Sequence, residues 1–243
     1  LMGFGCNVPA IMAARDITNK KDRALTMLMV PFMSCSARLP VYMLFVGAFF
    51  AEQKAIVMLS LYVLGVLLSI LFAFIMQRTP AFRQPKQDYV SELPAYRYPT
   101  LRTTGMHIWE RVADYLQKIP AVIIWASVII WALTYFPAGS MNDMEHSYLA
   151  AIGHWIEPVM QPLGFDWKMS VCLLTGLPAK EAIVSTMGIL YPSDSALYAF
   201  TPVTAYAFMT FVLLYFPCVA TITTLGKELG AKWAWFSLIQ SMI

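Results

Sequence analysis

Four segments of this sequence interrupt apolar stretches with glycine, proline and cysteine. Two are apolar segments broken by glycine and proline, residues 3–10 (GFGCNVPA) and residues 174–181 (LTGLPAKE). Each is followed along the chain by a segment with proline and cysteine, residues 31–38 (PFMSCSAR) and residues 216–221 (FPCVAT). Such breaks free backbone amide and carbonyl groups at membrane depth, which is tolerated only where they are buried in protein or line a polar cavity. Because interrupted segments at matching places in two halves mark the binding sites of secondary transporters, we predict a transport site here.

Three charged residues accompany these breaks. Arg38, Lys180 and Glu181 stand in apolar surroundings, where a basic side chain costs roughly 2.5 to 3.5 kcal/mol, so we expect all three to face protein or water. Lys180 and Glu181 are adjacent, so on a helix their side chains diverge by about 100° and do not pair face to face. We interpret Glu181 as a cation ligand, with Lys180 or Arg38 bracing carbonyl groups at a helix break. The alternatives are a purely structural role for the basic residues and a Glu181 that only offsets their charge.

The composition is that of a membrane protein. Hydrophobic residues make up 59% of the chain and charged residues 13%, and the mean hydropathy is +0.61. The charged fraction is roughly half that of an average soluble domain. We therefore expect an all-α membrane protein, a polytopic helical bundle with discontinuous or re-entrant helices, and no nucleic-acid partner.

Five apolar stretches are candidates for crossing the membrane. Three are uncharged and close to the roughly 20 residues that a spanning helix needs: Ala55–Met76 with 22 residues, Ile119–Phe136 with 18 and Pro202–Leu225 with 24. Two others, Leu25–Ala51 and Met169–Tyr191, are long enough but contain charged residues or proline. These two are therefore the uncertain spans.

Basic residues in the loops predict the orientation. Seven lie between Arg78 and Lys118 and four between Arg15 and Arg23, but none lies between Phe136 and Trp167. By the positive-inside rule, the first two regions are cytoplasmic and the third is external. If Met169–Tyr191 crossed the membrane, residues 192–201 would be cytoplasmic without one basic residue. The charges instead favour a re-entrant excursion that turns back near residues 177–181.

This orientation makes the two halves inverted copies. The segment after residue 3 runs from mid-membrane to the cytoplasm and precedes an outgoing helix with Pro31 and Cys35. The segment after Pro178 runs from mid-membrane to the outside and precedes an ingoing helix with Pro217 and Cys218. Inverted repeats bind substrate at their interface near the bilayer midplane. Glycine and proline are also more frequent in membrane helices generally, but two matched units favour the repeat interpretation.

Two regions outside the spans have their own patterns. Residues 80–99 carry four prolines among polar residues, which predicts an extended cytoplasmic linker. From Thr103 the pattern predicts a helix along the inner surface that leads into the span at Ile119. A second surface helix is expected over residues 148–159 on the outer side. This helix and its start carry His146, His154 and Glu157. These three side chains could form a metal entry site, or they could simply be solvated.

The quoted segments together resemble the motifs of a known family. Residues 3–10, 31–40, 178–181 and 217–221 look like those of the FeoB family of bacterial ferrous iron transporters, in matching order and spacing. The resemblance runs nearly end to end and covers the C-terminal part of that family's membrane domain. It implies a multi-pass permease of the bacterial inner membrane, with two inverted gate-type repeats, that imports Fe(II) and is coupled to an N-terminal GTP-binding domain.

The resemblance also implies a domain division and partners. Residues 1–78 correspond to the C-terminal part of the first gate-type repeat, residues 79–118 to a cytoplasmic linker with an amphipathic surface helix, and residues 119–243 to the second repeat. The chain opens inside an apolar element without an initiator Met, so we expect it to be the C-terminal piece of a longer polypeptide. The expected partners are membrane lipid, the GTP-binding domain and early helices of that polypeptide, small cytoplasmic accessory proteins and a second copy.

This chain departs from the full family pattern in one respect. No Gly-x-x-x-x-Gly-Lys-Ser/Thr phosphate loop occurs in these residues, and Gly226-Lys227-Glu228 lacks both the upstream glycine and the hydroxyl. We therefore expect no GTP site, no cofactor and no enzymatic activity in this chain.

Fe(II) as the transported ion gives the cysteines a role. Fe(II) accepts sulfur, imidazole and carboxylate, whereas Mg(II) and Ca(II) prefer oxygen. The predicted metal ligands are therefore Cys6, Cys35, Cys218 and Glu181. They lack the spacing and the closed ligand set of a structural zinc site. Cys172, outside the motifs, is expected to be a small buried hydrophobe. The remaining motif residues are expected to line or shape the pathway: Gly3, Gly5, Asn7, Pro9, Ser34, Ser36, Arg38, Gly176, Pro178, Lys180, Pro217 and Thr221.

Two alternative functions remain. One is a gate-type carrier of another solute such as a nucleoside, although cysteine-centred motifs offer few of the amide groups that would bind a base. The other is a membrane-embedded cysteine enzyme. An enzyme needs a base to activate its thiol, and His107, His146 and His154 are all expected in loops or surface helices.

Overall fold

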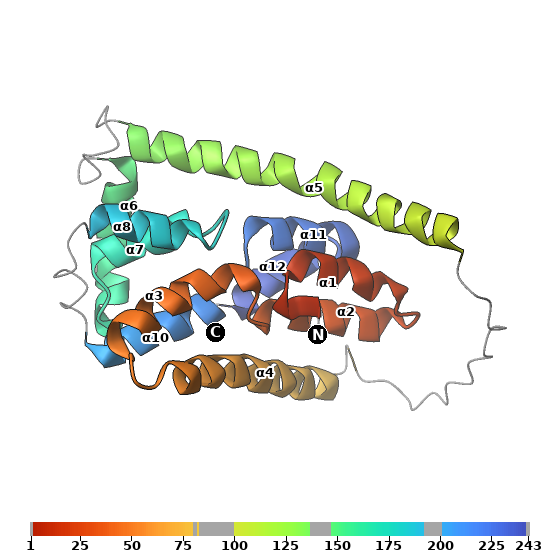
Figure 1. The fold of residues 1–243 in the computed structure, drawn as a ribbon, viewed down its shortest axis with the longest axis horizontal. Coiled ribbons are helices and arrows are strands. Elements are labelled where there is room, and N and C mark those ends of the chain that lie inside the picture. Colours follow the sequence, from red (N-terminus) through yellow and green to blue (C-terminus); the bar gives the residue numbers. More distant parts are fainter. Residues whose placement is uncertain (1, 80–81, 83–99, 137–146, 192–200, 242–243) are drawn as a thin grey trace.

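The computed structural model describes residues 2–79, 82, 100–136, 147–191 and 201–241, apart from the side chains of residues 118 and 119. This part of the chain is built from α-helices and short 3₁₀ turns and contains no strand (Figure 1). The predicted all-α fold is therefore confirmed. The α-helices are α1 (Asn7–Ala13), α2 (Lys20–Met29), α3 (Leu39–Phe49), α4 (Lys54–Arg78), α5 (Leu101–Tyr135), α6 (Tyr148–Met160), α7 (Trp167–Thr175), α8 (Ala182–Leu190), α10 (Pro202–Leu214), α11 (Val219–Leu229) and α12 (Ala231–Gln240).

Four regions of the described chain are long and apolar enough to cross a membrane: Lys20–Phe49, Lys54–Arg78, Leu101–Tyr135 and Pro202–Leu229. Only α4 and α5 are continuous helices. Proline breaks the other two, because it lacks a backbone N–H and clashes with the preceding turn. Pro31 lies in the 3₁₀ turn Val30–Phe32 between α2 and α3, and Pro217 lies between α10 and α11.

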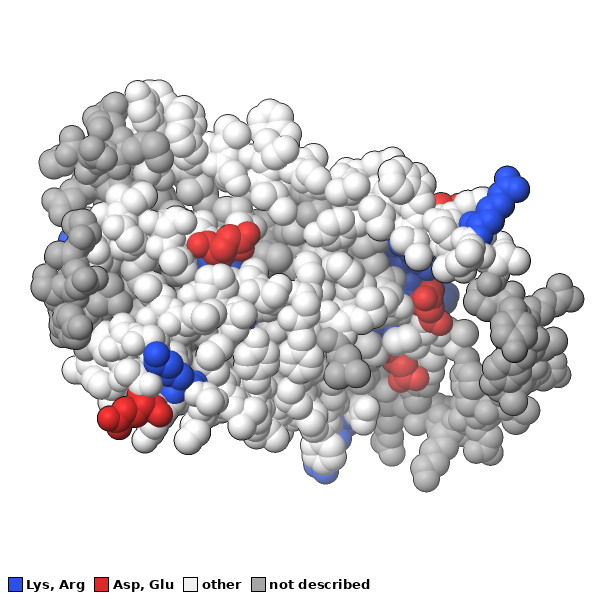
Figure 2. Space-filling view, in the orientation of Figure 1, with Lys and Arg blue, Asp and Glu red and all other residues white. Residues whose placement is uncertain are grey.

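The two continuous helices lie on opposite sides of the molecule, with the broken helices between them (Figure 1). Apolar side chains cover their outer faces; on α5 these include Trp109, Trp125 and Trp131. The view in Figure 2 shows a mostly uncharged surface, with few Lys, Arg, Asp or Glu atoms. Such outer surfaces suit a lipid environment or contact with further membrane helices.

Both expected surface elements are helices in the structure. The helix expected from Thr103 leads into the span at Ile119, because α5 is one helix of 35 residues that continues through Pro120. One proline in a long helix removes only one ladder hydrogen bond. His107 lies on this helix. The helix expected over residues 148–159 is α6. The membrane side on which each helix lies stays a prediction.

Several sequence predictions fall outside the described residues. They are the extended linker 80–99, except Phe82, the external loop 192–200 and His146.

α7 and α8 form the predicted re-entrant hairpin. Each has 9 residues, about 14 Å of helix, which is less than half of the hydrocarbon thickness. The two helices pack against each other and are joined by a turn over residues 176–181. Met169–Tyr191 is accordingly absent from the candidate spans among the described residues, as the loop charges predict.

Buried side chains form one large cluster and two smaller ones. The large cluster joins α3, α4, α7, α8 and α10 and includes Phe45, Met169 and Phe208. A second cluster joins α1, α2 and α11 around Ile11, Leu28 and Leu225. Elements from the two halves of the sequence therefore pack together on both sides of the helix breaks.

Candidate cation-binding site at two helix breaks

Two short segments, residues 2–6 and 176–181, are each bonded to a broken helix at the residue after a cysteine. We call these segments the first and second tips, and residues 30–38 and 215–218 the first and second breaks. The carbonyl of Gly5 accepts hydrogen bonds from the Ser36 backbone N–H at 3.1 Å and the Ser36 hydroxyl at 2.7 Å. The carbonyl of Leu177 accepts one from the Val219 N–H at 3.2 Å. Ser36 follows Cys35, and Val219 follows Cys218, so both halves build the same link.

Three cysteines begin helices at these places. Cys6 precedes α1, Cys35 precedes the 3₁₀ turn Ser36–Arg38, and Cys218 precedes α11; all have extended backbone angles. None uses its side chain to cap its helix, and all three are half-buried. Cysteine binds metals as the thiolate. The fold therefore places three side chains of a metal-binding type at helix starts, where none is used as a cap.

The three thiols border one region. Cys6 and Cys218 both pack against Val8, Met12 and Ala220. Cys6 also lies close enough to Cys35, Cys218 and Glu181 for their charges to interact. Within the described residues, however, no three His, Cys, Asp or Glu side chains come together as a metal-binding group. The ligand assignment therefore stays a prediction.

Arg38 braces the first break. Its side chain is 1% exposed, and it donates through Nη1 to the Met33 carbonyl at 2.7 Å and through Nη2 to the Pro31 carbonyl at 3.2 Å. These carbonyls have lost helical partners because the helix stops there. A planar guanidinium suits this task since its N–H groups diverge toward two acceptors. Arg38 thus fixes the backbone that carries Cys35.

Lys180 has the corresponding role in the second half. It is 3% exposed, and its Nζ donates to the Val212 carbonyl at 3.3 Å, near the end of α10. The same Nζ lies 3.6 Å from the centre of the Tyr215 ring, which is a cation–π contact. Lys180 therefore connects the second tip to the second break. The bracing expected of the two basic residues is what these contacts provide.

Glu181 is placed differently from the basic residues. Its side chain is exposed at the end of the second tip. Among the described residues it forms no ion pair with Lys180 or Arg38. No contact of Glu181 in the described residues supports the alternative in which it offsets the charge of a basic neighbour.

The other motif residues shape the tips and breaks. A Cβ on Gly3 would lie 3.2 Å from the Met33 Cβ, so the first tip packs tightly on the first break. A Cβ on Gly176 would lie 2.5 Å from Ile183 Cγ1 and 2.7 Å from the Tyr215 hydroxyl, which only glycine avoids. The Cys218 Sγ lies 3.0 Å from the hydroxyl of Thr221, which is fully buried. Four further members are buried, Asn7, Ser34, Pro178 and Pro217, whereas Pro9 is half-buried in the first turn of α1.

Three residues at the site were not predicted from the sequence. Tyr215 forms the aromatic platform for Lys180. Tyr115 of α5 lies close enough to Cys6 and Cys218 for electrostatic interaction. Gly65 lets α4 approach the first break, because a Cβ there would lie 2.9 Å from the Phe32 carbonyl. A small residue in a membrane helix often marks such an approach, so Gly65 had a sequence signal; the tyrosines had none.

Two predictions outside the breaks can also be compared with the structure. Cys172 is fully buried in the large core cluster, as expected for a small hydrophobe. His154 Nδ1 lies 3.2 Å from a Glu157 carboxylate oxygen on α6, so the two residues share a helix face as predicted. Their use as metal ligands is untested.

Comparisons with known families divide the chain into the regions seen in the fold. The family described as "Gate: Nucleoside recognition" matches residues 1–49 and 117–232. The family described as "Ferrous iron transport protein B C terminus" matches residues 58–111. The first match covers both tip-and-break units, and the second covers most of α4 and the start of α5.

Individual relatives match almost the whole chain. A "Fe(2+) transporter FeoB" of Staphylococcus aureus is 44% identical over 98% of this chain, and one of Methanocaldococcus jannaschii is 41% identical over all of it. A "Fe(2+) transport protein A/Fe(2+) transporter FeoB fusion protein" of Porphyromonas gingivalis is 41% identical over 99%. The chain spans only 37%, 38% and 35% of these three relatives. No solved structure matches it.

Proposed function

Since this chain belongs to the FeoB family and corresponds to the C-terminal part of its membrane domain, we propose that it forms the ion-binding half of an Fe(II) importer. The relatives are longer and carry Fe(2+) transport in their names. The observation that carries the proposal is the repeated unit in which a tip carbonyl bonds the residue after a break cysteine.

We propose that Fe(II) binds between the tips and breaks through Cys6, Cys35 and Cys218. Two of these thiols share a packing cluster, and all three stand at helix starts beside the tips and breaks. Thiolate ligands favour Fe(II) over the oxygen-preferring Mg(II) and Ca(II). Glu181, at the exposed end of the second tip, is proposed as a ligand that the ion meets beside the thiols.

The fixed backbone around the thiols supports selective but reversible binding. Arg38 holds two carbonyls of the first break, and Lys180 holds the Val212 carbonyl at the end of α10, so the cysteines keep their positions when no ion is bound. Arg38 is buried without a carboxylate partner among the described residues, and its charge opposes a divalent ion. Thiolate attraction and this repulsion together favour binding that is weak enough for release.

The test of thiol ligation is Fe(II) uptake by the full-length protein in proteoliposomes under anaerobic conditions. Changing Cys6, Cys35 or Cys218 to Ser should each reduce uptake while leaving insertion and folding intact. Cys172→Ser is the matched control, because this thiol is fully buried in the large core cluster and begins no helix at a break. Unchanged uptake in all three variants would remove thiol ligation. Nucleoside uptake in the same vesicles distinguishes the other gate-type function.

Glu181 needs a separate test because its charge has two explanations. If it ligates iron, Glu181→Gln keeps the shape but removes the charge, so uptake should fall severely while expression persists. If it only offsets Lys180, the double variant Glu181→Gln with Lys180→Met should recover transport. Recovery in the double variant would exclude the ligand role.

A further inference from the structure

α1 and α11 form a parallel pair that leads from the thiols to one end of the molecule. Each helix begins at a cysteine, Cys6 or Cys218, and both cysteines border the same cluster. Directly beyond them, Val8 of α1 packs against Ala220 of α11, with 2% and 4% of their surfaces exposed. The helices therefore close together immediately below the candidate ion site.

Arg15 joins this helix pair at its far end. It follows α1 in the turn Ala14–Asp16, and its Nη2 donates to a carboxylate oxygen of Glu228 on α11. Its Nη1 lies 3.7 Å from a carboxylate oxygen of Asp114 on α5. The side chains of Arg15 and Glu228 are 27% and 14% exposed, so water screens this pair less than a surface ion pair. One guanidinium thus ties together an element of the first half, an element of the second half and α5.

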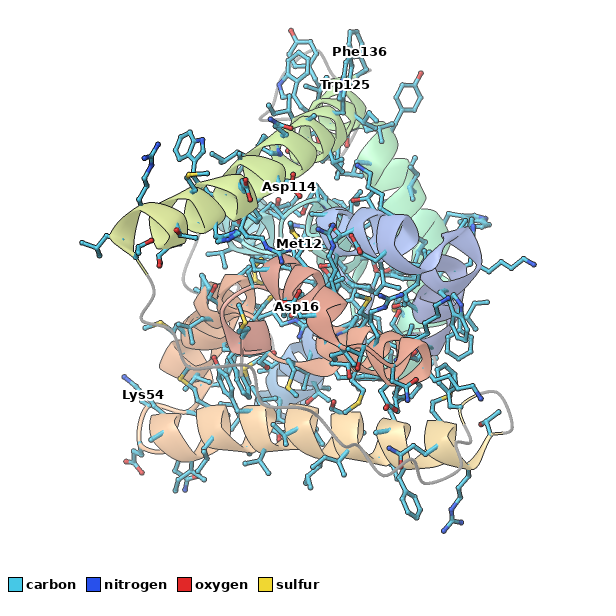
Figure 3. All side chains as sticks on the ribbon, turned by 90° about the vertical axis from the view of Figure 1, so that its right-hand side faces the viewer. Met12, Asp16, Lys54, Asp114, Trp125 and Phe136 are labelled. Carbon is cyan, nitrogen blue, oxygen red and sulfur yellow. The ribbon has the colours of Figure 1, made fainter. Side chains whose placement is uncertain are left out.

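Figure 3 views the molecule from this end and shows Asp114 on α5 above Met12 and Asp16. The hydrogen bond to Glu228 raises the pKa of Arg15 above its usual value. The guanidinium therefore remains charged at physiological pH. By the loop charges, this end of the molecule is the cytoplasmic one.

The matching helix pair in the other direction lacks this ionic contact. By the repeat relation, α8 and α3 correspond to α1 and α11, and they pack against each other on the other side of the breaks. The ends of both helices pack into the large core cluster. Leu190 and Tyr191 do so at the end of α8, and Phe49 and Phe50 do so at the end of α3. Among the described residues, the ionic contact is therefore specific to the predicted cytoplasmic side.

Space beside α1 indicates where separation is easiest. A groove of about 400 Å³ lies between α1 and α5, lined mainly by apolar residues including Met12, Val112 and Tyr115. α5 is thus incompletely packed on α1 there, whereas the seam between α1 and α11 is closed. An ion leaving the thiols toward the cytoplasm must part that seam or pass beside it.

We infer that Arg15, Glu228 and Asp114 form a cytoplasmic latch that holds α1, α11 and α5 together and must open for the ion to leave the thiol site. This inference rests on the proposed transport function. It adds a release gate and three residues that position the helices without binding the ion.

The latch is tested by access to the seam, which needs no iron. A reporter Val8→Cys is placed in the full-length protein with its four cysteines in this chain changed to Ser. It is treated with an impermeant maleimide on inside-out vesicles. Glu228→Gln should accelerate labelling about tenfold, which corresponds to ~1.4 kcal/mol of lost ion-pair free energy. Asp114→Asn should act in the same direction.

A neighbouring ion pair supplies the matched control. Arg111 Nη2 lies 3.4 Å from Asp16 Oδ1, but this pair is exposed and does not reach α11. Asp16→Asn should therefore leave the labelling rate unchanged. The exchanged pair, Arg15→Glu with Glu228→Arg, is made together with Asp114→Asn, so that the new carboxylate at position 15 does not face Asp114. It should return labelling toward the rate of Asp114→Asn alone, which separates the latch from simple misfolding.

The outcomes separate the latch from the proposed function. A parent labelling rate in Glu228→Gln, or equal acceleration by Asp16→Asn, would overturn the latch whatever the uptake assay gives. Failure of the parent protein to transport Fe(II), with labelling changed as expected, would instead reject the proposed function and leave the latch.

Discussion

Replacing Arg38 tests whether a forked donor at the first break holds the ion site in shape. Arg38→Met removes two hydrogen bonds from a charged group, each about 1.5 to 3 kcal/mol. It also relieves the cost of burying a basic side chain that has no acidic partner among the described residues, which is roughly 2.5 to 3.5 kcal/mol in a membrane. These effects nearly cancel, so we expect a net loss of only about 1 to 2 kcal/mol.

If charge alone mattered, Arg38→Lys would be more stable than Arg38→Met, but the geometry predicts otherwise. Arg38→Lys keeps the buried charge, but an ammonium on a single stem reaches one of the two carbonyls at a time. It therefore loses one hydrogen bond of about 1.5 to 3 kcal/mol with nothing gained in return. We expect Arg38→Lys to be no more stable than Arg38→Met.

The assays are thermal unfolding of the full-length protein in detergent, followed by tryptophan fluorescence, and Fe(II) uptake in proteoliposomes. Both variants should raise the KM for Fe(II), because the loosened break no longer fixes Cys35, and the maximal rate should fall less. If Arg38→Lys matches the parent in stability and KM while Arg38→Met fails, charge rather than the fork matters, and the bracing argument is refuted.

Three further substitutions test other contacts at the site, with stability measured in the same detergent assay. Gly176→Ala should cost about 1 to 3 kcal/mol and reduce uptake, because its Cβ overlaps Ile183 and the Tyr215 hydroxyl; unchanged stability would mean that the second tip is not tightly packed. Gly65→Ala should cost a similar amount by pushing α4 from the Phe32 carbonyl, and a neutral result would reject that close approach. Tyr215→Leu should lower the free energy of unfolding by about 2 kcal/mol, because the ring contact with Lys180 is lost. The same loss when Tyr215→Leu is made in the Lys180→Met variant would show that the ring does not act through Lys180.

The apolar and charge patterns of the sequence predict the membrane class, the re-entrant hairpin and the placement of breaks. They do so because glycine and proline cluster at the breaks, and because a cytoplasmic loop over residues 192–201 would contain no basic residue. A lone proline is a weaker signal, since α5 continues through Pro120. The bracing by Arg38 and Lys180 was also foreseeable, since buried basic groups must find acceptors.

Contacts between distant parts of the chain could not be predicted from the sequence. Nothing in the neighbourhood of Tyr215 indicates that its ring lies under Lys180, because 35 residues separate them and only the fold joins them. The continuity of α5 through residue 119 depends on packing and surroundings, which periodicity does not record. The Arg15–Glu228 pair likewise exists only because α1 and α11 run side by side.

The measurement that tests the central claim most directly is Fe K-edge X-ray absorption of the full-length protein loaded anaerobically with one Fe(II), with any metal bound by other domains subtracted. We predict sulfur in the first coordination shell of the iron. That sulfur should persist in Cys172→Ser and disappear when Cys6, Cys35 and Cys218 are all changed to Ser. A first shell of oxygen and nitrogen alone in the parent protein would contradict thiol ligation at the helix breaks.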